Sequence, residues 1–313
     1  MKSRRAGCGA LLLVAALAAA WLLLVPEPAP GPVGGWMAAA RVATAFVDTG
    51  GVRVRYVRAG SGPSVVLLHG FASSLYTWKD VLPALAADHD VIALDFPGFG
   101  GSQVPRPLDA ATFPGVVLAV MDQLGVRRAS LVGNSLGGAV AVGIAADHPE
   151  RVDRLVLVDS AGFNFAPRDR PLLLRLVGAP GMASLLERLP IRRRMVEAGL
   201  RQVFANDALV TRERVDEYTV PMLRPGAVRA ASEVLGRLAP SEFPVARVRV
   251  PTLVIWGRED RWIPLAHAGR FVAAIPGSRL EVIDACGHVP QEEPPAAVAA
   301  LLARFLAAPA RVY

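Results

Sequence analysis

Ser135 lies between Gly133 and Gly137 in the pattern G-x-S-x-G. An apolar run at 129–132 precedes the pattern and small residues at 136–146 follow it, as a strand and then a helix would. In such a sharp turn the glycines avoid clashes that side chains would make, and the helix N-terminus directs amide groups toward a developing oxyanion. Glycine-flanked serines also occur in ordinary loops, but this context predicts that Ser135 is an activated nucleophile.

A serine hydroxyl is a poor nucleophile at neutral pH and needs a base that is held in the right tautomer. Of the five histidines, His288 in the run CGHVP follows a predicted strand at 279–283. A loop there projects from the carboxyl edge of a sheet, beside the serine turn, which favours His288 as general base over a structural role. His69 also follows a strand, but its HGF setting indicates a different task. The other three are typical of solvated or capping positions: His89, His148 and His267.

An acid must orient the histidine, and Asp260 in the run WGREDRWIP follows the strand expected at 253–256. Its place gives the chain order Ser, Asp, His that is usual after a nucleophile elbow. Asp159 is a rival, because it ends the strand after the nucleophile and could also reach His288. Two weaker candidates are Glu259 and Asp284. The sequence therefore predicts Asp260 as the acid and leaves Asp159 open.

The elements that must position these residues alternate along the chain. Short apolar runs of strand length occur at 65–68, 91–94, 129–132, 155–158 and 253–256. Stretches with helical patterning occur at 75–87, 110–124 and 136–147. This alternation predicts an α/β fold with a mostly parallel central sheet flanked by helices. Residues 52–58 alternate apolar residues with arginine, which is typical of a half-exposed strand near a sheet edge.

The alternation stops after Asp159 and resumes near Val250. The stretch 162–244 has helical periods, prolines and arginines but no convincing buried strand. We expect it to be a helical lid inserted between strands six and seven, within a core made of residues 41–161 and 245–313. The alternative is a set of peripheral helices that covers no site.

Composition excludes several other classes of protein. The 313 residues carry a formal net charge of +7, but the basic residues are scattered among acids, so we expect no nucleic-acid partner. Two cysteines are too few for a disulfide framework. No pair of histidines has zinc-ligand spacing, and the glycines at 98 and 100 lack the third glycine of a dinucleotide loop. We therefore expect neither a metal nor an organic cofactor.

The N-terminus carries an apolar segment. Lys2, Arg4 and Arg5 precede an uncharged run at 9–25, and a Pro/Gly/Ala stretch at 26–40 follows. We expect residues 1–25 to be an uncleaved signal anchor, a transmembrane helix that holds the catalytic domain at a membrane outside the cytoplasm, and residues 26–40 to be a linker. The alternatives are secretion after cleavage and a buried N-terminal helix.

Taken together, these motifs resemble the α/β-hydrolase superfamily. The resemblance covers about residues 42–308 and rests on five stretches: HGF at 69–71, DFPGFGGS at 95–102, GNSLGG at 133–138, the spacing G-x-x-D-x-x-x-P at 257–264 and GH at 287–288. It is specific for the fold and the catalytic machinery, in the branch that carries a lid, and poorly specific for the substrate.

The resemblance implies an oxyanion hole made by the backbone amides of Phe71 and Leu136. His69 would shape that loop, with Gly70 supporting it. Relatives similar to haloalkane dehalogenases and epoxide hydrolases use aspartate as nucleophile, so Ser135 disfavours their reactions.

The expected activity is hydrolysis of a lipophilic carboxylic ester, a small-molecule substrate, through an acyl-enzyme. Asn134, before the serine, resembles the carbon–carbon bond hydrolases that cleave meta-cleavage products, which is the alternative within enzymes. An alternative of another class is a non-catalytic binding protein of the same fold.

Overall fold

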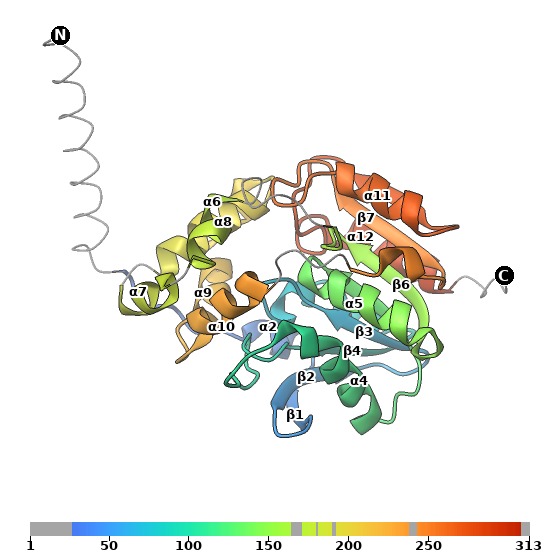
Figure 1. Ribbon diagram of the computed structural model, residues 1–313, viewed down its shortest axis with the longest axis horizontal. Helices are drawn as coiled ribbons and strands as arrows, with labels where there is room; N and C mark the ends of the chain where they lie inside the picture. Colours follow the sequence, from blue (N-terminus) through green and yellow to red (C-terminus); the bar gives the residue numbers. More distant parts are fainter. Residues whose placement is uncertain (1–26, 164–170, 180, 190–191, 238–242, 308–313) are drawn as a thin grey trace, which may run out of the picture.

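A mostly parallel eight-stranded sheet forms the centre of the molecule (Figure 1). The computed structural model describes residues 27–163, 171–179, 181–189, 192–237 and 243–307. Its strands lie in the order β1-β2-β4-β3-β5-β6-β7-β8, in which only the pairs β1/β2 and β2/β4 are antiparallel. Their bounds are β1 Thr44–Asp48, β2 Arg53–Ala59, β3 Ser64–Leu68, β4 Asp90–Leu94, β5 Ala129–Asn134, β6 Val152–Val158, β7 Thr252–Gly257 and β8 Arg279–Ile283.

The central strands are buried on both faces, as the continuous apolar runs predict. In β3, Val66 and Leu68 join one apolar cluster, while Val65 and Leu67 point to the other. The first cluster includes residues of α4 (Phe113–Gln123), α5 (Leu136–Asp147) and α11 (Ala266–Ala274). The second includes residues of α3 (Leu82–Leu85) and α12 (Pro295–Ala307). The expected α/β class is therefore confirmed.

One helix differs from the sequence expectation. The helix expected at 75–87 is a 3₁₀ turn, Leu75–Trp78, followed by the four-residue α3. Pro83 lies in the first turn of α3, where its missing N–H is tolerated, and it would break a longer helix. The half-exposed strand expected near a sheet edge at 52–58 is confirmed as β2, which is second from the edge because β1 pairs with it.

In the described part of the chain, five α-helices follow β6 and precede β7, and they lie together beside the sheet (Figure 1). Their bounds are α6 Leu172–Val177, α7 Met182–Arg188, α8 Arg192–Val203, α9 Arg212–Met222 and α10 Ala227–Arg237. The described residues between 162 and 244 contain no strand. Residues of α8 and α9 share a small apolar cluster with Val289, from the loop after His288. That cluster attaches the inserted helices to the core beside the candidate site.

The chain before β1 packs on the inserted helices. The Glu27 carboxylate accepts hydrogen bonds from the amides of Arg193 and Arg194, at 3.0 and 2.8 Å. The amide of Gly31 donates to Asp216 of α9 at 3.1 Å, and that of Gly34 to Glu217 at 2.5 Å. The short helix α2 (Gly35–Ala39) follows. From Glu27 onward, the stretch expected to be a linker is therefore bound to α8 and α9.

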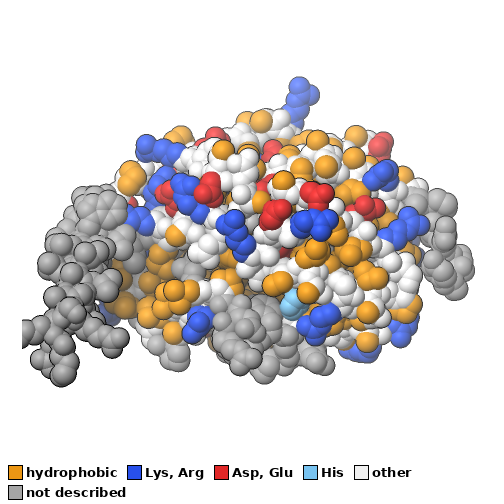
Figure 2. All heavy atoms as spheres, turned by 90° about the horizontal axis from the view of Figure 1, so that it is seen from above, with side chains coloured by type: hydrophobic (Ala, Val, Ile, Leu, Met, Phe, Trp, Pro, Cys, Tyr) orange, Lys and Arg blue, Asp and Glu red, His pale blue; other side chains and the backbone are white. Residues whose placement is uncertain are grey.

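Many arginines of the described chain are in ion pairs. Arg151 lies 2.6 Å from Asp122, and Arg128 lies 2.9 Å from Asp153. On the face shown in Figure 2, basic side chains are interspersed with acidic and hydrophobic ones. That face therefore carries no continuous stripe of one sign.

The expectation of a membrane anchor is corrected. Over the part of the chain that the structure describes, no helix is both long enough and apolar enough to cross a bilayer. Residues 1–25, on which the expectation rested, lie outside that part. The signal anchor, the transmembrane helix and the location outside the cytoplasm that followed from them are withdrawn.

Candidate active site

The predicted site residues follow the carboxyl ends of neighbouring strands. His69 follows β3, Ser135 follows β5 and Asp159 follows β6. Asp260 and His288 lie in the loops after β7 and β8. Because parallel strands end at the same edge of a sheet, residues far apart in the sequence, such as Ser135 and His288, line one pocket there.

Ser135 occupies a sharp turn between β5 and α5, with φ 53° and ψ −115°. A non-glycine residue adopts such a conformation only when its surroundings impose it. A Cβ at Gly133 would lie 2.4 Å from the carbonyl carbon of Gly137, and one at Gly137 would lie 2.2 Å from the Leu68 oxygen. The two glycines of the motif are therefore required by the close approach of backbone.

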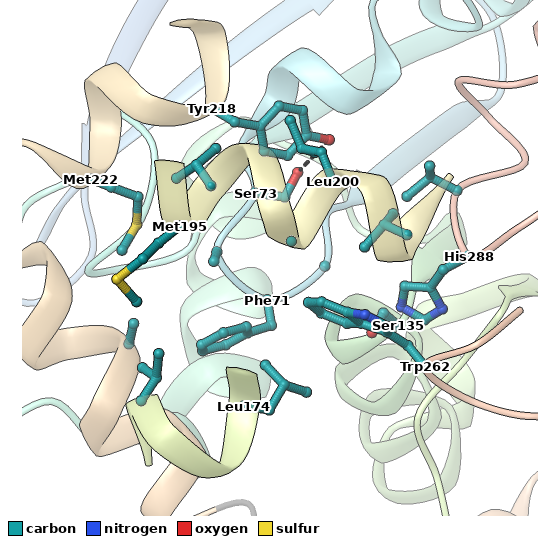
Figure 3. A pocket seen from close by; sticks show the side chains of 18 of the residues that line it. Phe71, Ser73, Ser135, Leu174, Met195, Leu200, Tyr218, Met222, Trp262 and His288 are labelled. Carbon is teal, nitrogen blue, oxygen red and sulfur yellow. Dashed lines mark hydrogen bonds between the residues drawn. The ribbon is translucent and has the colours of Figure 1, made fainter. Parts of the chain in front are cut away.

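Asp260 holds His288 in one orientation. The Nδ1–H of His288 donates to Asp260 Oδ2 at 2.7 Å, and both residues are buried. The other oxygen, Oδ1, accepts from the amides of Trp262 at 2.7 Å and Ile263 at 3.0 Å. The hydrogen bond between Nδ1 and Oδ2 selects the tautomer of the neutral His288 ring in which Nε2 carries no proton. A general base needs this tautomer. Ser135 and His288 line the same pocket and lie side by side in Figure 3.

Asp159 lies against this pair but has a different environment. Its side chain is fully buried and accepts from the Gly257 amide at 3.0 Å. Burial raises the pKa of Asp159 well above its usual range, and the charge of Asp260 and a hydrogen bond to it raise the pKa further. The raised pKa favours the protonated form of Asp159, which can donate a hydrogen bond to Asp260. The geometry gives Asp260 contact with the histidine and gives Asp159 contact with Asp260.

The two weaker acid candidates lie elsewhere. The Asp284 carboxylate pairs with Arg258 and is exposed. Glu259 is exposed as well.

Asp159, Asp260 and His288 also meet the spacing of a metal-ligand set, since one ligand atom from each lies within 4.8 Å of the others. Both oxygens of Asp260 and the Nδ1 of His288 are already hydrogen-bonded to protein groups. A protonated Asp159 would also be a poor ligand, because metal ligands must be deprotonated. The hydrogen bonds among these three side chains account for their proximity.

His69 fixes the loop expected to supply one oxyanion donor. Its Nδ1 donates to the Gly70 oxygen at 2.7 Å, and its Nε2 accepts from the Phe96 amide at 3.0 Å. Burial lowers the pKa of His69, so the ring stays neutral and keeps both bonds. In the described loops and turns, no backbone hydrogen bond uses the amide of Phe71 or of Leu136 as donor. Both amides are therefore available to an oxyanion.

Asn134 has a structural task that the sequence did not reveal. Its side-chain amide donates to the carbonyl oxygens of Val158 and His288, both at 3.1 Å. These bonds tie β5, the end of β6 and the loop of His288 together beside the nucleophile. From the sequence, Asn134 was interpreted only through a family resemblance. Its hydrogen-bond partners lie 24 and 154 residues away, so no local pattern indicates them.

Glu292 is a second buried polar residue near the site whose contacts the sequence did not reveal. Glu292 accepts from Thr77 at 2.6 Å and from the hydroxyl of Tyr218, and its other oxygen lies 3.2 Å from Arg214 Nε. The Ser73 hydroxyl donates to the Tyr218 hydroxyl at 3.4 Å (Figure 3). Tyr218 and Arg214 belong to α9, so the network joins the inserted helices to the loop four residues after His288.

The pocket above Ser135 has mainly apolar walls (Figure 3). Trp262 lies beside the histidine, with 5.6 Å between the ring centroids. The inserted helices supply most of the other apolar lining side chains: Leu174, Val177, Leu186, Met195, Val196, Leu200, Val203, Met222, Val228 and Ala231. A substrate that fills this space must present a large apolar group.

The strand order, the serine turn and the acid–histidine pair are those of α/β hydrolases, and the chain belongs to this family. The family profile described as alpha/beta hydrolase fold matches residues 63–295. The chain is therefore assigned to the hydrolases of this fold.

Three similar proteins differ in activity. The chain is 35% identical to a dihydrolipoyllysine-residue acetyltransferase component of the acetoin cleaving system from Cupriavidus necator, covering 85% of this chain and 70% of that protein. It is 34% identical to a 2-hydroxymuconate semialdehyde hydrolase from Pseudomonas sp., covering 82% and 91%. A solved structure of a membrane phospholipase A, described as a bacterial virulence factor, is 27% identical with a TM-score of 0.71, covering 98% of both chains. Their names denote different activities, so these similarities do not select one substrate for this chain.

Proposed function

We propose that this protein is a serine hydrolase that cleaves carboxylic esters with a long apolar group through an acyl-enzyme. The observation that carries the proposal is the hydrogen-bonded pair Asp260–His288 beside Ser135, at the base of a pocket with mainly apolar walls. The similar phospholipase, whose name denotes an ester-cleaving enzyme, supports it as well.

In the proposed mechanism, His288 Nε2 takes the proton of Ser135 as Oγ attacks the ester carbonyl. The amides of Phe71 and Leu136 stabilise the tetrahedral oxyanion, and such donors each contribute about 2.7–4 kcal/mol in acyl transfer. The imidazolium, stabilised by Asp260, then protonates the leaving alcohol. Water activated by the same histidine hydrolyses the acyl-enzyme and releases the acid.

We also propose that the inserted helices act as a lid, with residues 162–244 covering a core of residues 41–161 and 245–313. Side chains from α6 to α10 form much of the pocket wall. The inserted helices would then set the preference for the apolar group, while the residues at the strand ends perform the chemistry.

A second candidate is hydrolysis of a carbon–carbon bond in a meta-cleavage product. The relative named 2-hydroxymuconate semialdehyde hydrolase favours it, since it matches over most of both chains. Asn134 carries less weight for this candidate, because its hydrogen bonds give it a structural role.

Stopped-flow kinetics with p-nitrophenyl esters of increasing chain length test the proposal on the full-length protein. We expect a burst of p-nitrophenolate equal to the enzyme concentration and a kcat/KM that rises with acyl length, both lost in Ser135→Ala. The decay of the coloured 2-hydroxymuconate semialdehyde, measured in parallel, tests the second candidate. Fast turnover of that compound without ester hydrolysis would contradict the ester proposal.

A further inference from the structure

Helix α8 runs along the pocket and presents one face to it. The lining residues of α8 follow the helical spacing i, i+3, i+4, i+7, i+8 and i+11, and they are Arg192, Met195, Val196, Gly199, Leu200 and Val203. Residues at this spacing share one side of a helix. A single stripe of α8 therefore forms part of the wall from one end of the helix to the other.

The two ends of that stripe are far apart. At the C-terminal end, the Val203 oxygen accepts a hydrogen bond from the His288 amide at 2.8 Å, so this end lies at the catalytic residues. Arg192 is the first residue of the helix, and a rise of 1.5 Å per residue places it about 16 Å from Val203 along the axis. In Figure 3, Met195 lies on the opposite side of the pocket from His288, in agreement with this direction.

Arg192 is the one lining residue, within the described chain, that carries a permanent charge. The side chains that line the pocket from α6, α7 and α10 are all apolar: Leu174, Val177, Leu186, Val228 and Ala231. The stripe thus changes from apolar to cationic at its remote end.

The neighbouring arginines of α8 have protein partners. Arg193 Nε lies 2.9 Å from Asp216, and Arg201 lies 2.8 Å from Glu197. Arg192, half-buried, forms no ion pair with any residue that the structure describes. A guanidinium at an apolar wall is costly to desolvate unless an anion meets it, and carboxylates and phosphates match its fork of donors.

We propose that Arg192 binds an anionic group at the end of the substrate remote from the ester, so the preferred substrates are amphiphilic esters with a long apolar chain between the ester and a carboxylate or phosphate. This inference rests on the proposed ester hydrolysis and names its substrate class. The α8 stripe holds the chain, and the distance between its ends selects chain length.

Matched pairs of substrates test the inference. One member of each pair is a p-nitrophenyl ester of octanoic, decanoic or dodecanoic acid, and the other is the mono-p-nitrophenyl ester of the dicarboxylic acid of the same length. We expect wild-type kcat/KM to favour the carboxylate-bearing ester at the length that reaches Arg192, by about tenfold or more, because one charge-assisted hydrogen bond contributes on that scale. High salt should reduce the ratio of kcat/KM for the carboxylate-bearing ester to kcat/KM for the neutral ester.

Three variants assign the ratio to Arg192. Arg192→Gln should bring it close to one, and Arg192→Lys, which keeps a charge but loses the planar fork, should retain part of it. Arg201→Gln, on the exposed side of the same helix, should keep the wild-type ratio. Melting temperatures of all three verify folding.

Equal kcat/KM for both members at every length, or an unchanged ratio in Arg192→Gln, would overturn the inference. In that case the arginine stem only packs against the wall. Hydrolysis of the neutral esters would still uphold the proposed function. Absence of hydrolysis of either ester by folded protein would instead contradict the function on which the inference rests.

Discussion

At the scale of single residues, the site contains two carboxyl groups with opposite tasks. Asp260 accepts hydrogen bonds from two amides and from His288, which fix its side chain beside the imidazole. Asp159 is fully buried beside it, and this burial raises the pKa of Asp159 well above its usual range. The two residues have the same chemical type but different environments. Asp260 orients His288, and Asp159 supports Asp260.

This difference predicts the behaviour of Asp159→Asn. Asparagine keeps an acceptor for the Gly257 amide and a donor for Asp260, so we expect kcat within about threefold of wild type, since no hydrogen bond is lost. Asp159→Leu removes both bonds and should lower kcat more. Steady-state kinetics with a p-nitrophenyl ester measure both variants. A severe loss in Asp159→Asn would make Asp159 the ionised acid and contradict the assignment.

The same residue predicts a pH dependence of stability. Because the folded-state pKa of Asp159 is raised, the folded protein binds more protons than the unfolded chain above about pH 4. The free energy of unfolding should therefore fall as pH rises through the interval up to that raised pKa. Asp159→Asn should remove this part of the slope and be the more stable protein at neutral pH. Urea unfolding of both proteins across this pH range measures the free energy of unfolding. The same pH dependence in wild type and Asp159→Asn would contradict the prediction.

At the scale of elements, the inserted helices are attached through buried polar groups as well as apolar contacts. Glu292 lies four residues after His288, accepts a hydrogen bond from Tyr218 and forms an ion pair with Arg214, both of α9. Only 9% of Arg214 is exposed, so the guanidinium has little solvent around it and Glu292 is its buried counter-charge. The attachment of α9 and the position of the loop that carries His288 are therefore coupled.

Glu292→Gln should destabilise the protein by about 2–4 kcal/mol, because it leaves the buried guanidinium of Arg214 without its counter-charge. Urea unfolding measures this loss of free energy. Asp122→Asn, which removes an ion pair with Arg151 at the surface, is the matched control and should cost less than about 1 kcal/mol. Equal effects of the two substitutions would show that the Glu292 network contributes no more than a surface pair.

Elements were predictable where the signal was local. The apolar runs that form β3 to β7 are continuous, and the serine turn is contained in five residues. The edge strand β1 was not predicted, because its burial alternates between exposed and half-buried residues and no strongly apolar run marks it. The helix expected at 75–87 is divided into a 3₁₀ turn and α3, because Pro83 favours the first turn of a new helix.

At the scale of the whole molecule, the site depends on contacts that no local pattern contains. The contact between Asp260 and His288 was predictable, because the two residues follow the motif serine in the order Ser, Asp, His. The partners of Asn134 and Glu292 were not, since Glu292 bonds to Thr77 across 215 residues. The same holds for the stretch from Glu27, whose prolines and glycines suggested a linker although it packs on α8 and α9.

The most direct test of the central claim, that Ser135 is a nucleophile activated by His288 and Asp260, is labelling of the full-length protein with a fluorophosphonate probe. Peptide mass spectrometry then locates the adduct. We expect one adduct on Ser135 that is absent in Ser135→Ala and strongly slowed in His288→Ala and Asp260→Asn, while the control His148→Ala labels at the wild-type rate. Folded wild-type protein that stays unlabelled, or labels at the same rate without His288, would contradict the account and favour a non-catalytic binding protein of this fold.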